Sequence, residues 1–292
     1  MKLIRHLTWQ NMKSAKSRTL VTILGIILSA AMFTAVTTMG VSIQSYMIRT
    51  EVATNGDYMV RYDYSTNDDL AAIAKEESVT KLGTVGTVGY TSLELTGSGE
   101  TTREDYIIGA GNEAFFQMIP VNLEEGRLPR NGSELVITRS ACDYLQKSGL
   151  PCEIGQQVSF PIGTHYDWDN LELPGSGEPF EKTFTIVGIS DYFQYFEDYD
   201  LHLSSLLTFD DSSEEILWSR MFAKTDPKDA YKLGEKSFGQ SKRINQNLLN
   251  FYGISQYTNI NDMNHAFAAV LCLIIMAGSV SLIYNAFSIS VS

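Results

Sequence analysis

The sequence has no charged side chain between Thr19 and Ile48. A helix needs roughly 20 mostly apolar residues to cross the hydrocarbon core of a bilayer, so this stretch is long enough to span one. The last stretch, from Met263 to Ser292, also lacks Asp, Glu, Lys and Arg. These two absences predict one membrane helix at residues 19–45 and a second at residues 263–292, on either side of a large polar domain at residues 46–262.

Acidic residues are also missing from the start of the chain, because none precedes Glu51. Five basic residues give residues 1–18 a charge of +5, and the formal net charge of −12 leaves −17 for the rest. Cytoplasmic segments beside membrane helices are enriched in Lys and Arg, so this asymmetry predicts a cytoplasmic N-terminus and an extracytoplasmic domain. The acidic balance argues against a nucleic-acid partner. The basic residues are Lys2, Arg5, Lys13, Lys16 and Arg18.

Residues 1–18 are predicted to form a basic amphipathic helix. Leu3, Leu7 and Met12 recur at roughly helical spacing, and Trp9 suits the level of the lipid headgroups. The competing interpretation is a secretory signal peptide, which has a short apolar core and a cleavage site. The apolar core of a signal peptide has about 7–15 residues, and the apolar run here is much longer. We therefore favour an uncleaved helix on the inner membrane surface.

Cysteine is scarce, with three residues in the chain. Cys272 lies in the second apolar stretch, where a thiol behaves as a small buried hydrophobe. Cys142 and Cys152 would face an oxidising compartment, where a disulfide can form. A domain of this size does not need a disulfide to be stable, so the sequence leaves both states open.

Common catalytic motifs are absent. The chain has no G-x-x-x-x-G-K-[ST] loop for ATP, no H-E-x-x-H and no nucleophile elbow. Its four histidines have no metal-ligand spacing, and His165 with Asp167 and Asp169 lies in a Gly-, Pro- and Asp-rich stretch that predicts a solvated loop. We therefore expect that this chain has no enzymatic activity, binds no cofactor and holds no metal ion.

The region between the apolar stretches is predicted to be an α+β domain with a split subdomain. Residues 56–64 alternate as a strand does, a helix follows from Thr66 or Asn67, and residues 79–95 are rich in β-formers. Residues 220–224 predict another strand, with a cap at Asp226, a long helix to about Tyr252 and an extended segment at 253–257. These two β-α-β units predict one subdomain built from residues 46–104 and 203–262.

Residues 105–202 are predicted to form an inserted β-rich subdomain. The expected strands are 105–110, 134–138, 157–161 and 182–189, and the expected helices are 113–119 and 140–147. The paired acids are expected at helix starts, where the helix dipole favours negative charge. These pairs are Asp68–Asp69, Asp210–Asp211 and Glu214–Glu215.

One motif identifies a family. Residues 125–138 read EGRLPRNGSELVIT, followed by SACDYLQKSGL, a Gly-x-x-Val segment at 155–158 and a strand ending Val-Gly-Ile at 187–189. Together with the basic N-terminus and LVTILGIILSAA, this order resembles the MacB-like, FtsX-like ABC transporter permeases. The motif residues, expected to be structural, are Gly126, Arg127, Pro129, Glu134, Gly155, Val187 and Gly188.

The resemblance implies a permease subunit of the mechanotransmission type in a bacterial plasma membrane. In such systems a separate cytoplasmic ATPase hydrolyses ATP, and the membrane helices relay its motion to the outer domain. The implied partners are that ATPase, a second permease copy or a homologous permease, and the bilayer. The implied task is export or removal of peptides, lipids or drugs. Such permeases have four membrane helices, so we expect this chain to be the N-terminal part of a longer permease or a truncated one.

Two groups of side chains are candidates for contacts. Small residues in the apolar stretches would allow close helix packing; they are Gly25, Ser29, Ala277, Gly278 and Ser281. The aromatic run at 192–199 either covers the domain core or forms an exposed surface for an amphiphilic or cationic peptide. Salt-sensitive binding of labelled cationic peptides would test that second interpretation. The aromatic residues are Tyr192, Phe193, Tyr195, Phe196 and Tyr199.

Two alternatives share the two-helix plan. One is a membrane sensor with an exterior ligand-binding domain, although sensors usually begin with a cytoplasmic tail much shorter than residues 1–18. The other is an FtsX-type regulator of cell-wall hydrolases that transports nothing. Two further apolar runs after Ser292 would indicate a permease, whereas a helical signalling segment would indicate a sensor. A neighbouring hydrolase gene would indicate the regulator.

Overall fold

The computed structural model describes residues 16–97, 100–164, 179–191, 204–212, 215–255, 266, 269–281 and 284. Their contacts divide the chain into two units, residues 50–249, here called the core domain, and residues 1–49 with 250–292. The predicted amphipathic helix lies outside the described residues, except for its last three positions. The predicted loop at 165–178 and the aromatic run at 192–199 also lie outside them.

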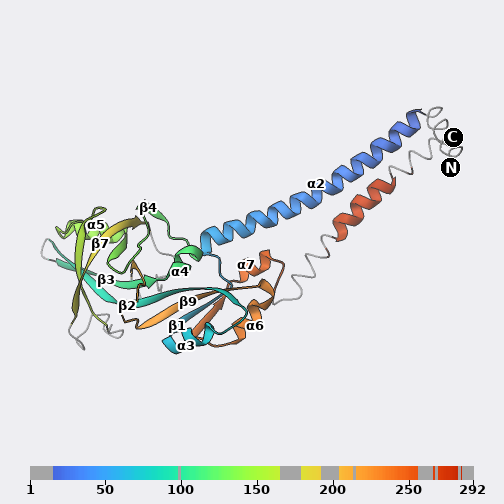
Figure 1. Ribbon diagram of the computed structural model, residues 1–292. Helices are drawn as coiled ribbons and strands as arrows, with labels where there is room; N and C mark the ends of the chain where they lie inside the picture. The colour runs from blue at the N-terminus through green and yellow to red at the C-terminus, as the bar shows by residue number, and fades with distance from the viewer. Residues whose placement is uncertain are drawn as a thin grey trace. The chain divides into compact units, whose positions relative to one another are not determined.

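The N-terminal apolar stretch forms one long helix, α2 (Lys16–Asn55). It contains Ile23–Asn55, which among the described residues is the one helix long and apolar enough to cross a membrane (Figure 1). The helix extends past the predicted end at residue 45, because Arg49 and Glu51 do not interrupt it. A shorter apolar helix, Ala269–Ser281, lies in the second stretch. The second membrane helix stays a prediction, since this helix is shorter than the roughly 20 residues that a span needs.

Among the described residues of the core domain, ten strands form a single sheet. The strand order is β10-β1-β9-β2-β3-β8-β5-β7-β4, and β6 also pairs with β7. The strands are β1 (Val60–Ser65), β2 (Val79–Gly97), β3 (Glu100–Gly111), β4 (Leu123–Gly126), β5 (Glu134–Thr138), β6 (Gln157–Ile162), β7 (Phe180–Ser190), β8 (Ser204–Phe209), β9 (Trp218–Thr225) and β10 (Ser241–Ile244).

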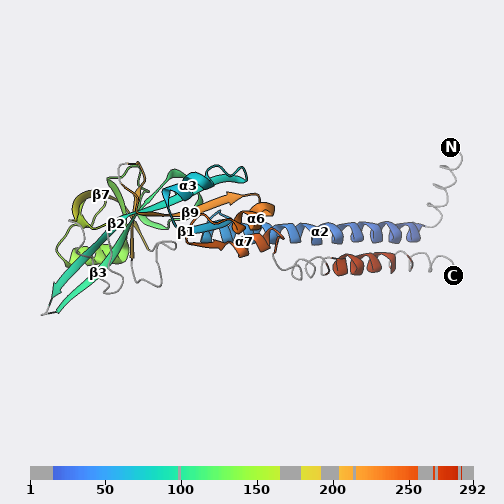
Figure 2. The same ribbon diagram turned by 90° about the horizontal axis from the view of Figure 1, so that it is seen from below.

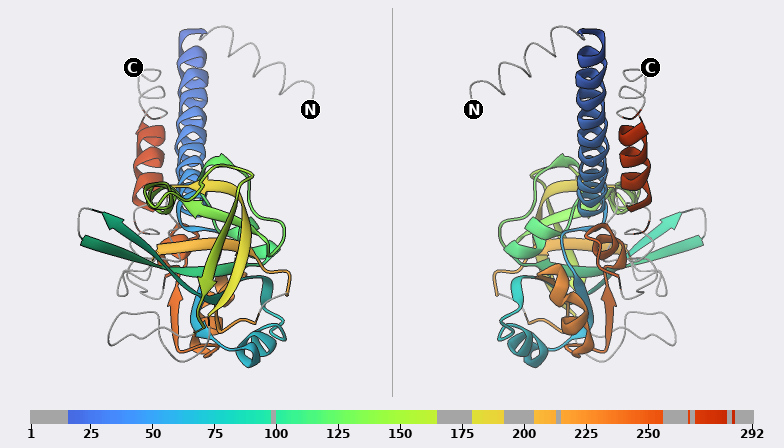
Figure 3. Two further views of the ribbon diagram at one scale, coloured as in Figure 1. Left: turned by 90° about the vertical axis from the view of Figure 1, so that its left-hand side faces the viewer. Right: turned by 90° about the vertical axis from the view of Figure 1, so that its right-hand side faces the viewer.

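Short helices connect the strands, and several begin at a capping residue. Thr66 caps α3 in a capping box with Asp69, and Asn112 accepts from the backbone N–H of Phe115 at the start of α4. Lys236, just after α6, forms an ion pair with Glu76 at 2.6 Å, and α3 and α6 lie at the same end of the domain (Figure 3). The helices are α3 (Asn67–Ile73), α4 (Glu113–Met118), α5 (Arg139–Lys147), η1 (Pro227–Asp229), α6 (Ala230–Glu235) and α7 (Gln246–Phe251).

The sheet brings the two ends of the core domain together. β1 pairs antiparallel with both β9 and β10, so the first strand lies between the last two. In the other half, β3 pairs parallel with β8 and β5 pairs parallel with β7. The fold is therefore mixed α+β, as predicted. The division into a split subdomain and an inserted one stays a prediction, because the strands continue through both regions in one sheet.

The core lies on both faces of the sheet. Leu135 and Ile137 belong to one hydrophobic cluster, whereas Val136 between them belongs to a second. Ile186 and Val187 divide between the clusters in the same way. Because successive side chains of a strand point to opposite faces, these central strands are buried on both sides.

The β2–β3 hairpin projects beyond the neighbouring strands (Figure 2). β2 and β3 pair with each other as far as Gly97 and Glu100. The pairing of β2 with β9 ends at Thr87, and the pairing of β3 with β8 begins at Tyr106. Beyond the bridge between Tyr90 and Gly163, the described residues of the hairpin therefore form a two-stranded ribbon.

The long helix predicted up to Tyr252 is wrong. The segment contains η1, α6, β10 and α7 instead. Ser65 Oγ donates to Phe238 O at 2.6 Å, and a Cβ at Gly239 would lie 2.6 Å from Asp63 O. These contacts draw the chain against β1, where β10 pairs with it, and no helix can continue through that point.

Two smaller predictions are also wrong. Gly253 has φ +75° and forms a turn, so the described part of 253–257 is not a strand. Asp210 and Asp211 follow β8 in a loop and do not begin a helix. Asp211 instead accepts a hydrogen bond from the backbone N–H of Gly132 at 2.6 Å, which ties this loop to the turn before β5.

Candidate functional site

The family motif gathers around β7. Arg127 N donates to Val187 O at 2.8 Å, just after β4 ends. Gly126 has φ +82°, and a Cβ there would lie less than 3.0 Å from Val187 O. A Cβ at Gly188 would lie 2.5 Å from Arg127 O. The two glycines therefore allow the backbones of β4 and β7 to approach more closely than other residues permit.

Arg127 and Glu134 close this arrangement with a bidentate ion pair. Arg127 donates through both terminal nitrogens to the two carboxylate oxygens of Glu134, each at 2.6 Å. Arg130 N donates to Glu134 Oε2 at 2.9 Å. The hydrogen bonds from Arg127 hold the pKa of Glu134 below its usual range, and the pKa of Arg127 is raised by the same bonds.

The Glu134 carboxylate is expected to stabilise the domain in a pH-dependent way. Because its folded pKa is lowered, its contribution is present above the unfolded pKa of about 4.3 and is lost as pH falls through the folded pKa. Glu134→Gln should therefore lower the urea midpoint at neutral pH, and the difference from the natural chain should shrink on acidification. Glu153→Gln is the control, because Glu153 is exposed and accepts a hydrogen bond from the neutral side chain of Gln156. A difference that grows at low pH would contradict the expectation.

The remaining motif residues lie close by. Gly155 has φ +90°, and its N–H donates to Ile186 O on β7 at 2.8 Å. Pro129 is buried in the loop between Arg127 and β5. Six of the seven residues are thus on β7 or bonded to it or to each other, and Pro129 lies in the loop beside them; Glu134 O also accepts from Thr208 Oγ1 at 2.7 Å. That arrangement suits positioning of the chain rather than chemistry on a ligand.

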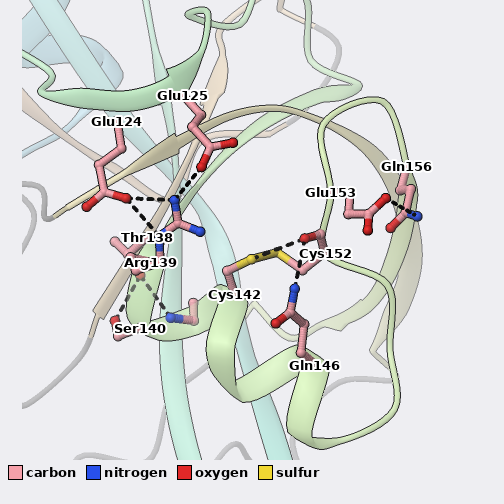
Figure 4. Close-up of a disulfide and its surroundings, with 11 residues drawn as sticks. Glu124, Glu125, Thr138, Arg139, Ser140, Cys142, Gln146, Cys152, Glu153 and Gln156 are labelled. Atoms are coloured by element: carbon pink, nitrogen blue, oxygen red, sulfur yellow. Dashed lines mark hydrogen bonds and ion pairs between the residues drawn. A yellow bond between two sulfur atoms is a disulfide. The ribbon is translucent and has the colours of Figure 1, made fainter.

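Cys142 and Cys152 form a disulfide beside this motif (Figure 4). Cys142 lies on α5 and Cys152 in the following loop, with Cα atoms 5.5 Å apart and both side chains buried. Gln146 Nε2 donates to Cys152 O at 3.3 Å, which holds the same loop. The sequence left this pairing open, and the separation of the two Cα atoms lies within the usual range for a disulfide.

The start of α5 is fixed to the β4 edge by charge. Arg139 forms ion pairs with Glu124 at 2.7 Å and with Glu125 at 2.9 Å (Figure 4). The hydrogen bonds that Arg139 donates to these two carboxylates raise its pKa. Thr138 Oγ1 accepts from Ala141 N at 3.3 Å and caps the helix. α5 is therefore held at its first turn by β4 and further along by the disulfide.

Removing the disulfide is expected to cost stability. The two cysteines are 10 residues apart, and closing a loop of this size stabilises a fold by about 2–3 kcal/mol. Cys142→Ala combined with Cys152→Ala should lower the free energy of unfolding by that amount in urea denaturation. Cys272→Ala, which changes a free cysteine in the second apolar stretch, is the control. A double variant as stable as this control would contradict the expectation.

The junction after α2 is a feature that the sequence analysis missed. α2 ends at Asn55, and the next residue, Gly56, has φ +92° and donates its N–H to Val52 O at 2.9 Å. A Cβ at Gly56 would lie 2.7 Å from Ile119 Cδ1. Asp57 N then donates to Met118 O at 2.8 Å, and the Asp57 carboxylate pairs with Lys224 on β9. A glycine directly after a long helix is the sequence signal that predicts such an end.

The other candidates from the sequence are the metal ligands, the small helix residues and the aromatic run. Among the described residues, no group of three or more His, Cys, Asp or Glu could hold a metal ion. Ser29 Oγ donates to Gly25 O within α2 at 2.8 Å, and a Cβ at Gly278 meets no described atom within 4 Å. Helix packing through the small residues stays a prediction. The aromatic residues at 192–199 and the His165 group lie outside the described residues.

Comparison with known proteins found one matching family model and several similar solved structures. The family model of the MacB-like periplasmic core domain matches residues 19–237. No curated protein matches the sequence. Among solved structures, the extracellular domain of the noncanonic ABC-type transporter YknZ from Gram-positive bacteria is similar at 10% identity and a TM-score of 0.35, over 64% of this chain and 98% of that one.

Two further structures are similar at the same level. The periplasmic region of MacB from Actinobacillus actinomycetemcomitans has 10% identity and a TM-score of 0.37, over 68% of this chain and 94% of that one. A domain of a putative permease protein from Porphyromonas gingivalis has 14% identity and a TM-score of 0.33, over 58% of this chain and 73% of that one.

Proposed function

Because this chain belongs to the family of the MacB-like periplasmic core domain, found in ABC transporter permeases, we propose that it transmits motion from a separate cytoplasmic ATPase to its core domain. In this mechanism ATP is bound and hydrolysed by the ATPase. The permease supplies a membrane helix that moves and an outer domain that is moved with it. The likeness in sequence to the family supports the permease assignment, and the structure of α2 supports the mechanical role.

The observation that carries the proposal is the continuity of α2. The helix runs without a break from Lys16 to Asn55, which at 1.5 Å per residue corresponds to about 60 Å. A bilayer core is about 30 Å thick, so the helix is longer than a span requires. Its last six residues, from Thr50, belong to the core domain. An unbroken helix is stiff, so a displacement at one end is passed to the other.

The end of α2 is joined to the core domain by backbone contacts. Asp57 N donates to Met118 O, and Met118 is buried in the cluster that also contains Phe115 and Phe222. The rings of Phe115 and Phe222 lie 5.7 Å apart between α4 and β9. A displacement of Gly56 is therefore resisted by the packed side chains beside the sheet. This coupling is what a mechanically driven domain needs.

The direction of this transmission follows from charge. We propose that the N-terminus lies in the cytoplasm, where an ATPase resides, and the acidic core domain outside, and the basic segment before residue 19 supports this orientation. We propose a dimer with a second permease copy or a homologous permease, with the small residues of the apolar stretches at the helix contacts. The proposed cargo is a peptide, lipid or drug, and an acidic exterior domain favours a cationic one.

Softening the end of α2 tests the mechanism. Replacing Thr50, Glu51 and Val52 with three glycines should disfavour the helix by about 3 kcal/mol relative to three alanines. The glycine variant is expected to keep the ATP hydrolysis of the ATPase and to lose substrate export. The alanine variant, which alters the same side chains and keeps the helix, is expected to retain both. If the glycine variant exports substrate at the natural rate, the proposed mechanism is wrong.

A further inference from the structure

The two segments that connect the core domain to the apolar stretches lie side by side inside it. The incoming segment, residues 56–59, follows α2 and leads into β1. The outgoing segment, residues 244–249, follows β10 and leads through α7 toward the second apolar stretch (Figure 1). β1 and β10 are paired strands, and Val60 is the register partner of Ile244. The chain therefore enters and leaves the domain at one edge of the sheet.

Asn245 binds the two segments to each other. Its backbone N–H donates to Met59 O at 2.9 Å, and its side-chain Nδ2 donates to Tyr58 O at 3.3 Å. Its Oδ1 accepts from Leu248 N at 3.1 Å and caps the first turn of α7. The residue is buried. One side chain thus holds the incoming segment with its donor and starts the outgoing helix with its acceptor.

The incoming segment is also held from its other sides. Met59 N donates to Ala223 O on β9 at 2.9 Å, and Asp57 N donates to Met118 O at 2.8 Å. The Tyr58 and Phe222 rings pack edge to face with centroids 5.2 Å apart. The incoming segment is therefore fixed to the sheet, and the Asn245 side chain extends that fixation to the outgoing helix.

We infer that Asn245 is a positioning residue that locks the incoming and outgoing segments into one joint, so that motion of either connection reaches the core domain through both. This inference rests on the proposed function. Without the Nδ2 bond, the side-chain link from Asn245 to Tyr58 O is lost, whereas the backbone bond from Asn245 N to Met59 O remains. A given movement of the connecting segments would then move the core domain less. Each strand would keep its place in the sheet.

Asn245→Ser separates the two roles of the side chain. Serine is a good helix cap, so α7 keeps its first turn, while the bond to Tyr58 O is lost. Removing one hydrogen bond of this kind corresponds to roughly a 2- to 10-fold rise in local opening. Hydrogen–deuterium exchange of the full chain should show that rise in peptides covering residues 56–60 and 244–249.

Asn112→Ser is a matched control elsewhere in the fold. Asn112 also caps a short helix, accepting from Phe115 N at 2.7 Å, and also bridges through Nδ2, to Leu82 O at 3.3 Å. Its serine variant should raise exchange near residues 82–84 and leave 244–249 unchanged. If Asn245→Ser leaves exchange at the joint unchanged, or raises it equally throughout the chain, the inference is overturned.

The effect on coupling is measured with the full chain assembled with its ATPase, with and without ATP and Mg²⁺. The natural chain should show an ATP-dependent change in exchange in the core domain, and Asn245→Ser should reduce that change while ATP hydrolysis continues. An undiminished change in a variant whose joint has loosened would overturn the inference and leave the proposed function standing. The absence of any ATP-dependent change in the natural chain would overturn the proposed function, whereas the exchange at the joint without ATP still tests the lock itself.

Discussion

Asp63→Ala is expected to lower the free energy of unfolding of the core domain by about 3–5 kcal/mol. Asp63 Oδ1 accepts from Arg220 Nε at 2.5 Å and lies 3.0 Å from Arg61 Nε. The side chains of Asp63, Arg220 and Arg61 are 4%, 8% and 12% exposed. Removing the carboxylate leaves two guanidinium groups close together with little water to screen them, which is why the loss is large.

The measurement is urea denaturation of the purified protein, compared with a carboxylate removed from the surface. Glu76 pairs with Lys236 at 2.6 Å, but the Lys236 side chain is 44% exposed. Exposed ion pairs contribute about 0–1 kcal/mol, so Glu76→Ala should change the stability little. Equal losses in the Asp63 and Glu76 variants would show that the buried cluster contributes no more than a surface pair.

Gly126→Ala is expected to have the second largest effect, a loss of more than about 3 kcal/mol. A non-glycine residue at positive φ costs about 1–3 kcal/mol. The added Cβ would also lie less than 3.0 Å from Val187 O, so β4 would have to move away from β7. Arg127 N would then lose its hydrogen bond to Val187 O, and the Arg127–Glu134 pair beside it would shift.

Gly155→Ala separates the two causes of that loss. Gly155 has φ +90°, similar to the φ of +82° at Gly126, but a Cβ there meets no atom of the described residues within 4 Å. It should therefore show the backbone cost alone in the same denaturation experiment. If the two alanine variants lose the same stability, the close approach of β4 to β7 contributes nothing to the loss, and the expectation is wrong.

Local signals made much of the fold predictable. The expected strand at 134–138 matches β5, because a tight turn precedes a short apolar run that ends at a helix cap. The helix α3 begins where Thr66 and Asp69 complete a capping box. The central strands are also recognisable in the sequence, because strands buried on both faces give continuous apolar runs.

Contacts between distant residues made the rest unpredictable. The segment after α6 carries no strand signal strong enough to reveal β10, which forms because β1 offers an edge to pair with. The pairs Asp63–Arg220 and Asn245–Tyr58 join residues far apart in the sequence. At the candidate site, the motif residues could be named from the sequence, but their convergence on β7 depends on the register of β4, β5 and β7.

The disulfide between Cys142 and Cys152 has a consequence for topology. Thiols stay reduced in the bacterial cytosol and are oxidised outside it, so this pair records which side of the membrane the domain reached. Both cysteines are buried, so the disulfide is protected from reduction during extraction as long as the domain stays folded. Counting the alkylatable thiols of the unfolded chain therefore reports its orientation. One thiol means that the domain crossed the membrane, and three mean that it stayed inside.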